Sequence, residues 1–334
     1  DFRQVNVFAG KNNSGKTTIL EGLFLLTGPT NPALPLKINE FREISKIDEN
    51  SWRLIFNKLD ENATIELSGE LEKPKEKRNL RIKPNMKSVS TLSKTRIDEE
   101  RYDARLDLIP DGKDSYSEVS PAIDGLILEY FQINGDDNEQ KRVTATIVLR
   151  DTGIEVNRPA DYKEPLRGVF INAKTIFGAA MGTRFDNIQI TKRTDRIIKL
   201  LRRIEPSLVN LSLGTDGIIY CDIGLDRLIP VNVMGDGMFR LLSIILAISD
   251  TQDGIVLIDE IENGFHYSSQ EILWDAIFQS AKEFNVQIFA TTHSIECVRA
   301  FCSSSSRQVQ NSDTIRLYRI ERKEDDFKAV RRSE

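Results

Sequence analysis

A phosphate-binding pattern near the start of the chain constrains its fold more than any other feature. Residues 10–17 read Gly-Lys-Asn-Asn-Ser-Gly-Lys-Thr, directly after the apolar run Val5–Ala9 and before a helical pattern over residues 18–26. Gly10 and Gly15 permit a tight turn whose backbone N–H groups point inward, where they can surround phosphate oxygens. Strand, loop and helix follow in the order that a nucleoside triphosphate site needs, so we expect an α/β fold.

The side chains of this loop suggest separate roles. Lys16 would place a positive charge near the β- and γ-phosphates, and we expect it to act in catalysis as well as binding. The hydroxyl of Thr17 is a suitable ligand for Mg²⁺. The expected nucleotide contacts comprise the whole loop: Gly10, Lys11, Asn12, Asn13, Ser14, Gly15, Lys16, Thr17 and Thr18.

The acidic partner of this loop lies far along the chain. Residues 255–260 read Ile-Val-Leu-Ile-Asp-Glu, an apolar run typical of a central parallel strand that delivers its acids at the carboxyl end. Asp259 is the expected Mg²⁺ ligand, and Glu260 can polarise the water that attacks the γ-phosphate. About 240 residues separate Lys16 from Asp259, so a large insertion is expected to divide one nucleotide site.

A second strand pattern ends in polar residues one βα unit later. Residues 287–294 read Gln-Ile-Phe-Ala-Thr-Thr-His-Ser, which would bring His293 to the same edge of the sheet as Asp259. An imidazole there can hydrogen-bond the γ-phosphate and report its presence. His266 precedes a capping-box match at Ser268 and Glu271 that predicts a helix start, so a structural or interface role is expected for it.

A further anion-binding pattern precedes an apolar helix. Gly235, Asp236 and Gly237 come directly before residues 238–249, which are apolar almost all round. Free N–H groups and the positive end of the helix dipole favour an anion at such a terminus. Because the chain already has one phosphate loop, this second anion-binding site is expected to contact the nucleotide that another copy binds, across a dimer interface. A simple turn with a helix cap is the alternative.

Composition restricts the class of protein. The 334 residues carry a net charge of −5, which argues against wholesale coating of nucleic acid but allows a local basic patch. Three cysteines without metal-ligand spacing favour a reducing cytoplasm, and two histidines are too few for a His-rich metal site. No apolar run reaches the length of a membrane span and no signal peptide is visible.

The domain organisation follows from changes in pattern along the chain. We expect residues 1–28 and 166–334 to form a split core, and residues 29–165 to form an insertion of mostly antiparallel β-structure with some helix. The basic stretch 73–87 is interpreted as a solvated hairpin loop in preference to a DNA contact. Residues 186–205 predict one helix whose charged side is solvated, with nucleic-acid binding as the alternative for its cations, which are Arg193, Arg196, Lys199 and Arg203.

Together these motifs resemble the ABC-type ATPases of the SMC/RecF/OLD branch. The matching pieces are the loop over residues 10–18, Gly235 to Gly237 before an apolar helix, the run 255–260 and the polar end 291–294. The Asn-Asn-Ser-Gly-Lys-Thr loop, the stretch Ile-Asp-Glu-Ile-Glu-Asn-Gly-Phe-His and Ala-Thr-Thr-His-Ser are similar to OLD-like AAA-family ATPases. The resemblance covers roughly residues 1–45 and 166–300 and says little about the insertion.

The resemblance implies a mixed sheet with flanking helices and an ATP molecule sandwiched between two heads. It gives Glu260 the role of general base, His293 the role of switch, and Gly235 to Gly237 the role of the family's signature. Met234 stands where that signature usually has Ser, and no Gln is evident for the loop that couples Mg²⁺ to the insertion. OLD proteins usually continue into a TOPRIM nuclease domain, and about 40 residues after His293 cannot hold one.

The functional hypothesis is therefore an ATP-hydrolysing head that dimerises on ATP and Mg²⁺. It would control a DNA-acting effector, such as a TOPRIM-like nuclease that is either truncated from this chain or a separate polypeptide, in anti-phage defence. One alternative is a nucleotide-gated binding module with negligible hydrolysis. Another is a RecF-like DNA-repair clamp that binds duplex through Arg196, Lys199 and Arg203. The absence of an Asn-Lys-x-Asp motif favours adenine over guanine.

Overall fold

The computed structural model divides the chain into two compact units, residues Asp1–Pro29 with Asp161–Glu334, and residues Thr30–Ala160. It describes residues 2–44, 49–60, 62–72, 75–86, 123–134, 140–150, 152–172, 179–307, 314–323 and 326–331. Within these ranges no helix is both long enough and apolar enough to cross a bilayer. The phosphate loop, the acids and His293 all belong to the first unit.

A six-stranded mixed sheet organises the first unit, in the order β14-β13-β1-β12-β11-β7. All neighbouring strands are parallel except β14, which is antiparallel to β13. The bounds are β1 Val5–Ala9, β7 Gly168–Ile171, β11 Ile255–Ile258, β12 Gln287–Thr292, β13 Ile315–Lys323 and β14 Asp326–Arg331. Every residue of β11 is buried, as expected for a parallel strand covered on both faces.

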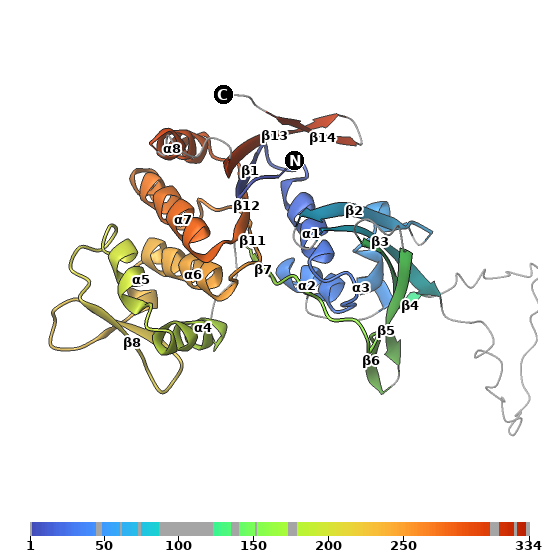
Figure 1. Cartoon of the computed structure of the whole chain (residues 1–334), viewed down its shortest axis with the longest axis horizontal. Helices are drawn as coiled ribbons and strands as arrows, with labels where there is room; N and C mark the ends of the chain where they lie inside the picture. Colours follow the sequence, from blue (N-terminus) through green and yellow to red (C-terminus); the bar gives the residue numbers. More distant parts are fainter. Residues whose placement is uncertain are drawn as a thin grey trace, which may run out of the picture. The chain divides into compact units, whose positions relative to one another are not determined.

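Helices cover both faces of this sheet (Figure 1). Helix α1 (Lys16–Leu26) lies on one face, where it contacts β7, β11 and β12. On the other face lie α6 (Asp236–Asp250), α7 (Gln270–Phe284) and α8 (Ile295–Ser306). The side chains of α6 are buried from Leu241 to Ser249, so this helix forms the centre of the core, in keeping with its apolar sequence.

The region predicted as one helix over residues 186–205 is two helices. Helix α4 (Ala179–Ile190) ends before α5 (Thr194–Leu201) begins, and Lys192 between them has a φ of 57°, which no helix residue can adopt. Two cations of this region form ion pairs with acids of α7. Arg196 pairs with Glu283, and Arg203 lies 2.7 Å from Asp275.

A small antiparallel sheet follows α5 in the first unit, with the order β10-β9-β8. Its strands are β8 (Asn210–Leu213), β9 (Ile219–Asp222) and β10 (Ile229–Pro230). Strand β10 is short, because Val231–Val233 directly after it form the 3-10 turn η3 that leads toward α6.

The second unit is a five-stranded antiparallel sheet in the order β2-β3-β4-β5-β6, accompanied by short helices. The bounds are α2 Leu34–Phe41, α3 Glu49–Arg53, η1 Asn57–Leu59, β2 Ile65–Glu72, β3 Lys75–Met86, β4 Ile123–Asn134, β5 Gln140–Arg150 and β6 Gly153–Asn157.

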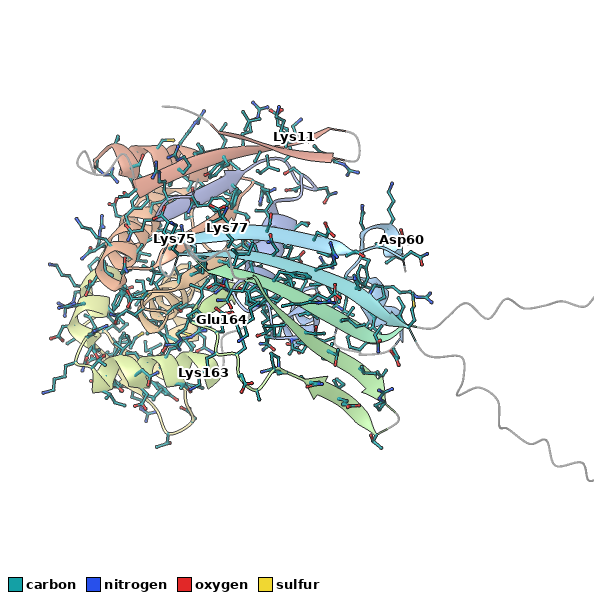
Figure 2. All side chains as sticks on the ribbon, turned by 45° about the vertical axis from the view of Figure 1, so that its right-hand side comes forward. Lys11, Asp60, Lys75, Lys77, Lys163 and Glu164 are labelled. Atoms are coloured by element: carbon teal, nitrogen blue, oxygen red, sulfur yellow. The ribbon has the colours of Figure 1, made fainter. Side chains whose placement is uncertain are left out.

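Of the basic stretch 73–87, predicted as a solvated loop, the described residues 75–86 form strand β3. Figure 2 labels Lys75 and Lys77 at the opposite end of the β2–β3 pair from Asp60. Lys77 lies 3.3 Å from Glu70 on β2, and Lys83 lies 2.9 Å from Glu129 on β4. The loop interpretation was wrong because acids on neighbouring strands, far away in sequence or across the turn, balance these cations.

Candidate nucleotide site

Three neighbouring parallel strands bring the motif residues to one edge of the sheet. The phosphate loop follows β1, the acids follow β11 and His293 follows β12, and these strands are adjacent in the order β1-β12-β11. The loop is tied to this edge by a hydrogen bond of 3.3 Å from the Gly10 N–H to the Thr292 carbonyl. Segments about 240 residues apart in sequence therefore form one site, as the motifs predicted.

The phosphate loop has the backbone geometry of an anion cradle. Gly15 at the start of α1 has a φ of 84°, and Asn13 has a φ of 59°. A Cβ added at Gly10 would lie 2.7 Å from the carbonyl oxygen of Ile320, so only glycine fits there. No side chain caps the N-terminus of α1, and the buried Ser14 Oγ has no hydrogen-bond partner among the described residues. This loop fits a phosphate group, whose oxygens would accept from these donors. Of the remaining loop residues, Lys11, Asn12 and Thr18 are exposed.

Lys16 is buried at the mouth of the loop. Its Nζ donates to the carbonyl oxygens of Gly10, at 3.0 Å, and Lys11, at 2.8 Å. Burial lowers the pKa of its ammonium group, while the nearby carboxylates of Asp259, Glu260 and Glu262 act in the opposite direction. The charge is thus held close to the acids, where a polyphosphate could share it.

Thr17 and Asp259 form a pair of hard oxygen ligands. The Thr17 hydroxyl donates to the Asp259 carboxylate, with 3.0 Å to each oxygen. Among the described residues no group of three or more His, Cys, Asp or Glu side chains could hold a metal by itself. Mg²⁺ commonly binds through one or two protein oxygens together with substrate phosphates, so this pair beside the phosphate loop fits that ion.

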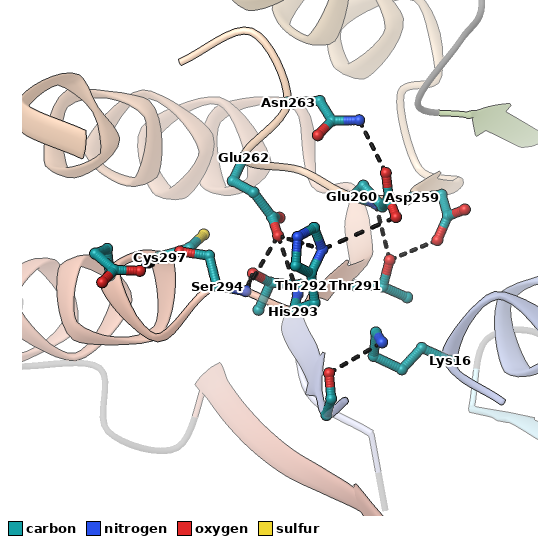
Figure 3. A network of polar contacts seen from close by, with 12 residues as sticks. Lys16, Asp259, Glu260, Glu262, Asn263, Thr291, Thr292, His293, Ser294 and Cys297 are labelled. Atoms are coloured by element: carbon teal, nitrogen blue, oxygen red, sulfur yellow. Dashed lines mark hydrogen bonds and ion pairs between the residues drawn. The ribbon is translucent and has the colours of Figure 1, made fainter. Parts of the chain in front are cut away.

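Thr291, the penultimate residue of β12, fixes both acids. Its fully buried hydroxyl donates to Asp259 Oδ1 at 2.5 Å and accepts from the Glu260 N–H at 2.9 Å. Glu260 has a φ of 45°, a strained value for a residue with a side chain. Its Oε2 accepts from Asn263 Nδ2 at 2.9 Å (Figure 3). The strained backbone thus directs Asp259 and Glu260, although adjacent in sequence, to different partners.

His293 lies among the acids at the end of β12. Its Nδ1 is 3.1 Å from Glu262 Oε1 and 3.9 Å from Glu260 Oε1. The Glu262 oxygen also accepts from the backbone N–H of His293 at 2.9 Å and of Ser294 at 3.2 Å. The Ser294 side chain then caps α8 by accepting from the Cys297 N–H. Figure 3 shows this network on the side of His293 away from Lys16.

Helix α6 presents its N-terminus to the loop that follows the acids. Gly235 is the residue before the helix and has a φ of 96°, while Asp236 and Gly237 form the first turn. A Cβ at Gly237 would lie 3.2 Å from the Gly264 carbonyl, so the helix start packs closely on that loop. The two glycines therefore stand at a helix N-terminus as predicted, and their contact with a second nucleotide stays a prediction.

Arg240, one turn further along α6, ties this helix to the strand ends. The guanidinium group is buried and donates to the Asn172 carbonyl at 2.8 Å and the Asp259 carbonyl at 3.2 Å. Burial lowers its pKa to about 10, against the raising effect of Asp259, Glu260 and Glu262. Arg240 is a single cation in an otherwise apolar helix sequence. This pattern could have identified it from the sequence, but the sequence analysis did not use it.

His266 has a local structural role. Its Nδ1 accepts from the Ser268 N–H at 3.5 Å and so caps the 3-10 turn η4 (Tyr267–Ser269). The predicted capping box is wrong, because α7 starts after Ser269 and Glu271 pairs with Arg307 at 2.7 Å instead. Sequence reasoning also missed the roles of Thr291, Glu262 and Asn263, although all three lie within the motifs that carried the resemblance.

A phosphate loop, paired acids and a polar strand end on one mixed parallel sheet define a P-loop ATPase of the ABC/AAA type. A family profile described as "AAA domain, putative AbiEii toxin, Type IV TA system" matches residues 5–299. The chain belongs to this family of ATPase domains, which confirms the ATPase prediction made from the motifs.

Two relatives were found, and the name of one of them agrees with this assignment. An "ATP/GTP phosphatase" of Helicobacter pylori is 23% identical over 326 residues, covering 89% of this chain and 81% of that protein. The "Uncharacterized protein MJECL11" of Methanocaldococcus jannaschii is 39% identical over 75 residues, covering 22% of this chain and 66% of that protein.

Solved structures of SMC heads are more distant. The head bound to the C-winged helix domain of ScpA gives a TM-score of 0.47 at 10% identity, with 98% of this chain and 90% of that chain covered. The head domain from Thermotoga maritima gives 0.40 at 12% identity, with 99% and 90% covered. Scores at this level support no conclusion about partners or mechanism.

Proposed function

We propose that this ATPase binds ATP with Mg²⁺ and hydrolyses it by attack of a water molecule that Glu260 orients. The observation that carries the proposal is the contact of Thr17 with Asp259, 3.0 Å apart at the phosphate loop, with Glu260 as the next residue. Thr17 and Asp259 would hold Mg²⁺, which supplies positive charge to the β- and γ-phosphates when bound. The name of the Helicobacter pylori relative includes GTP, so hydrolysis of both nucleotides should be compared.

Other residues of the site contact the phosphates or hold Glu260 in place. Lys16 neutralises negative charge on the β- and γ-phosphates. Asn263 holds the Glu260 carboxylate through a hydrogen bond of 2.9 Å, so that its other oxygen can accept a proton from water. His293, 39% exposed beside Glu260, hydrogen-bonds the γ-phosphate.

The nucleotide is also proposed to be shared between two copies of the chain. The α6 N-terminus at Gly235, Asp236 and Gly237 has no side-chain cap and would contact the γ-phosphate held by the partner copy. Large apolar side chains flank the same edge: Val233 is 69% exposed, Tyr267 68% and Ile295 60%. Apolar groups gathered around a polar site are typical of a surface that another protein covers.

Steady-state hydrolysis with two variants tests the enzymatic proposal. Glu260→Gln keeps the shape of the side chain but removes the base, so kcat should fall by about 100-fold or more while ATP still binds. Lys16→Ala should lose ATP binding as well. Glu271→Gln and Lys282→Ala alter α7 side chains, of which Glu271 is 46% exposed and Lys282 is exposed, and serve as matched controls with unchanged turnover. Undiminished turnover in Glu260→Gln and Lys16→Ala would contradict both assignments. Negligible turnover in the wild type, together with dimerisation on ATP, would favour the nucleotide-gated binding module.

The work driven by ATP is proposed to be control of a separate effector, such as a TOPRIM-like nuclease in anti-phage defence. This part rests on the resemblance to OLD-like ATPases, and the family description, which names a putative toxin of a TA system, is compatible with it. Co-expression with the product of the neighbouring gene tests it: complex formation and nuclease activity should both depend on ATP. Nuclease activity that is identical with wild type and Glu260→Gln, with and without ATP, would refute ATP control.

The alternative of a DNA clamp loses its main support. Arg196 and Arg203, two of its three proposed contacts, form ion pairs with Glu283 and Asp275 of α7. A cation already paired with a carboxylate offers less to a phosphate backbone, because the pair must break first.

A further inference from the structure

Glu262 is a buried carboxylate beside the site to which the motif analysis gave no role. It lies three residues after Asp259 in the loop that follows β11, and its side chain is 8% exposed. An ionised carboxylate in such a place costs free energy unless donors compensate it. The arrangement of its two oxygens therefore indicates what this side chain does.

One oxygen of Glu262 contacts three nitrogen atoms of a single segment. Oε1 accepts from the N–H groups of His293 and Ser294, at 2.9 and 3.2 Å, and lies 3.1 Å from His293 Nδ1. Two consecutive backbone amides and the ring between them are thus fixed by one atom. Glu260, at 3.9 Å from the same ring nitrogen, is instead engaged by Asn263.

The contacts of Glu262 with residues 293 and 294 use only one of its two carboxylate oxygens. Oε2 is buried and has no hydrogen-bond partner among the described residues, and the same holds for Nε of the neighbouring cation Arg240. A carboxylate with one unsatisfied oxygen stabilises a fold less than a fully paired one, since the desolvation cost is only partly recovered. Stability alone gives a weak reason for glutamate at this position.

The chemistry of the contact fixes the ring of His293. An ionised carboxylate only accepts hydrogen bonds, so the approach of Nδ1 to 3.1 Å from Glu262 Oε1 favours a proton on Nδ1. The other ring nitrogen, Nε2, is then the one left for a phosphate oxygen. The same carboxylate holds the backbone on both sides of the Cα of His293, which limits the motion of the ring as a whole.

We propose that Glu262 is the positioning residue of His293: it holds residues 293 and 294 and orients the imidazole toward the γ-phosphate of bound nucleotide. The proposal rests on the proposed function, in which His293 contacts that phosphate. Glu262 itself does not touch the nucleotide, so its loss should affect turnover through His293 and leave ground-state binding of ATP nearly unchanged.

A double-mutant cycle on the full chain tests this. The variants are Glu262→Ala, Glu262→Gln, His293→Ala and the double variant Glu262→Ala/His293→Ala, each measured for kcat and for the Kd of ATP. Glu262→Ala should lower kcat by about 10–100-fold, as loss of an orienting partner often does, with less than about 3-fold change in Kd. The double variant should be no slower than His293→Ala alone, because the two residues act as one unit. Glu262→Gln should recover part of the rate, since its amide oxygen can still accept from both N–H groups.

Controls separate this proposal from the function on which it rests. Glu271→Ala removes a glutamate of α7 whose side chain is 46% exposed and should keep the wild-type kcat, and thermal melting of each variant confirms folding. If His293→Ala retains full turnover, the role of His293 in the proposed function is refuted. If His293→Ala is impaired but Glu262→Ala is not, or if the two losses multiply in the double variant, positioning by Glu262 is refuted. A loss of ATP affinity in Glu262→Ala as large as its loss of kcat would also overturn it.

Discussion

At Asp259 the requirements of catalysis and of stability conflict. Burial raises the pKa of its carboxyl group above the ordinary value of 3.8, although hydrogen bonds from Thr291 and Thr17 lower it. The folded state therefore holds the proton more tightly than the unfolded state. Stability from the neutral form is present below pH 3.8 and is lost as the pH rises through the folded-state pKa. At neutral pH the ionised Asp259 carboxylate therefore lowers the stability of the folded state. Its proposed role as a Mg²⁺ ligand would explain why aspartate stands at this position.

Asp259→Asn should accordingly stabilise the fold while it abolishes hydrolysis. We expect Tm at pH 7 to rise by about 2–4 °C, the shift that ~1 kcal/mol produces in a domain of this size, and the gain to disappear near pH 4. ATP with Mg²⁺ should raise the Tm of the wild type more than that of the variant, because the variant has lost a metal ligand. Calorimetric melting over a pH series measures both effects.

Asp275→Asn provides a control of opposite sign. Asp275 is partly buried, which works against ionisation, but hydrogen bonds from Arg203 and Arg307 hold its pKa below the ordinary value. Its carboxylate therefore contributes stability above the unfolded pKa that is lost as the pH falls. Its replacement by Asn should lower Tm at pH 7 or leave it unchanged. If Asp259→Asn had a lower Tm than the wild type at pH 7, the claim that the ionised Asp259 carboxylate destabilises the fold would be refuted.

Among the elements, those that carry the motifs could be predicted from the sequence. Strands β1, β11 and β12 are short apolar runs that end in glycine or polar residues, and parallel strands bring such ends to a common edge. The same rule placed Asp259 and His293 beside the phosphate loop. Helix α6 was evident from its continuous apolar sequence, and its start at Asp236 is two residues earlier than the apolar run suggests.

Contacts within the site could not be predicted, because they depend on tertiary geometry. Nothing local indicates that Glu260 adopts a φ of 45°, since glycine would be expected at that value. The hydroxyl of Thr291 reaches Asp259 only because β12 lies next to β11. Likewise, the acids that pair with Lys77 and Lys83 lie on neighbouring strands, so the charges of β3 looked unbalanced in sequence.

At the scale of the whole molecule, the central question is whether the site is complete in one copy. Within one chain the phosphate loop, the acids and His293 meet, but the Gly235 end of α6 packs on the Gly264 loop, where exposed Val233 and Tyr267 flank it. A partner copy that covers this edge would bury both side chains. Because the proposed interface is apolar at these points, a single charge there should prevent assembly without affecting nucleotide binding.

Val233→Glu should therefore keep ATP affinity but lose dimerisation and most turnover. With the Glu260→Gln change, which retains bound ATP, the otherwise wild-type chain should dimerise on ATP and the Val233→Glu chain should stay monomeric in sedimentation velocity. Ile190→Glu is the matched control: Ile190 is 71% exposed at the end of α4, a helix whose Asn187 contacts Asp250 at the far end of α6. Dimerisation of the Val233→Glu chain as strong as that of the control would place the interface elsewhere.

Mixing two inactive chains distinguishes a shared site from simple pairing. A Lys16→Ala chain lacks a working phosphate loop but has an intact α6 terminus, and a Val233→Glu chain has the reverse. If each nucleotide contacts the loop of one copy and α6 of the other, a mixed dimer contains one complete site, and the mixture should regain turnover that neither chain shows alone. The regained rate should fall on dilution, since it depends on association. No gain in the mixture, at concentrations where wild-type chains dimerise, would show that each copy hydrolyses ATP without help from the α6 terminus of its partner.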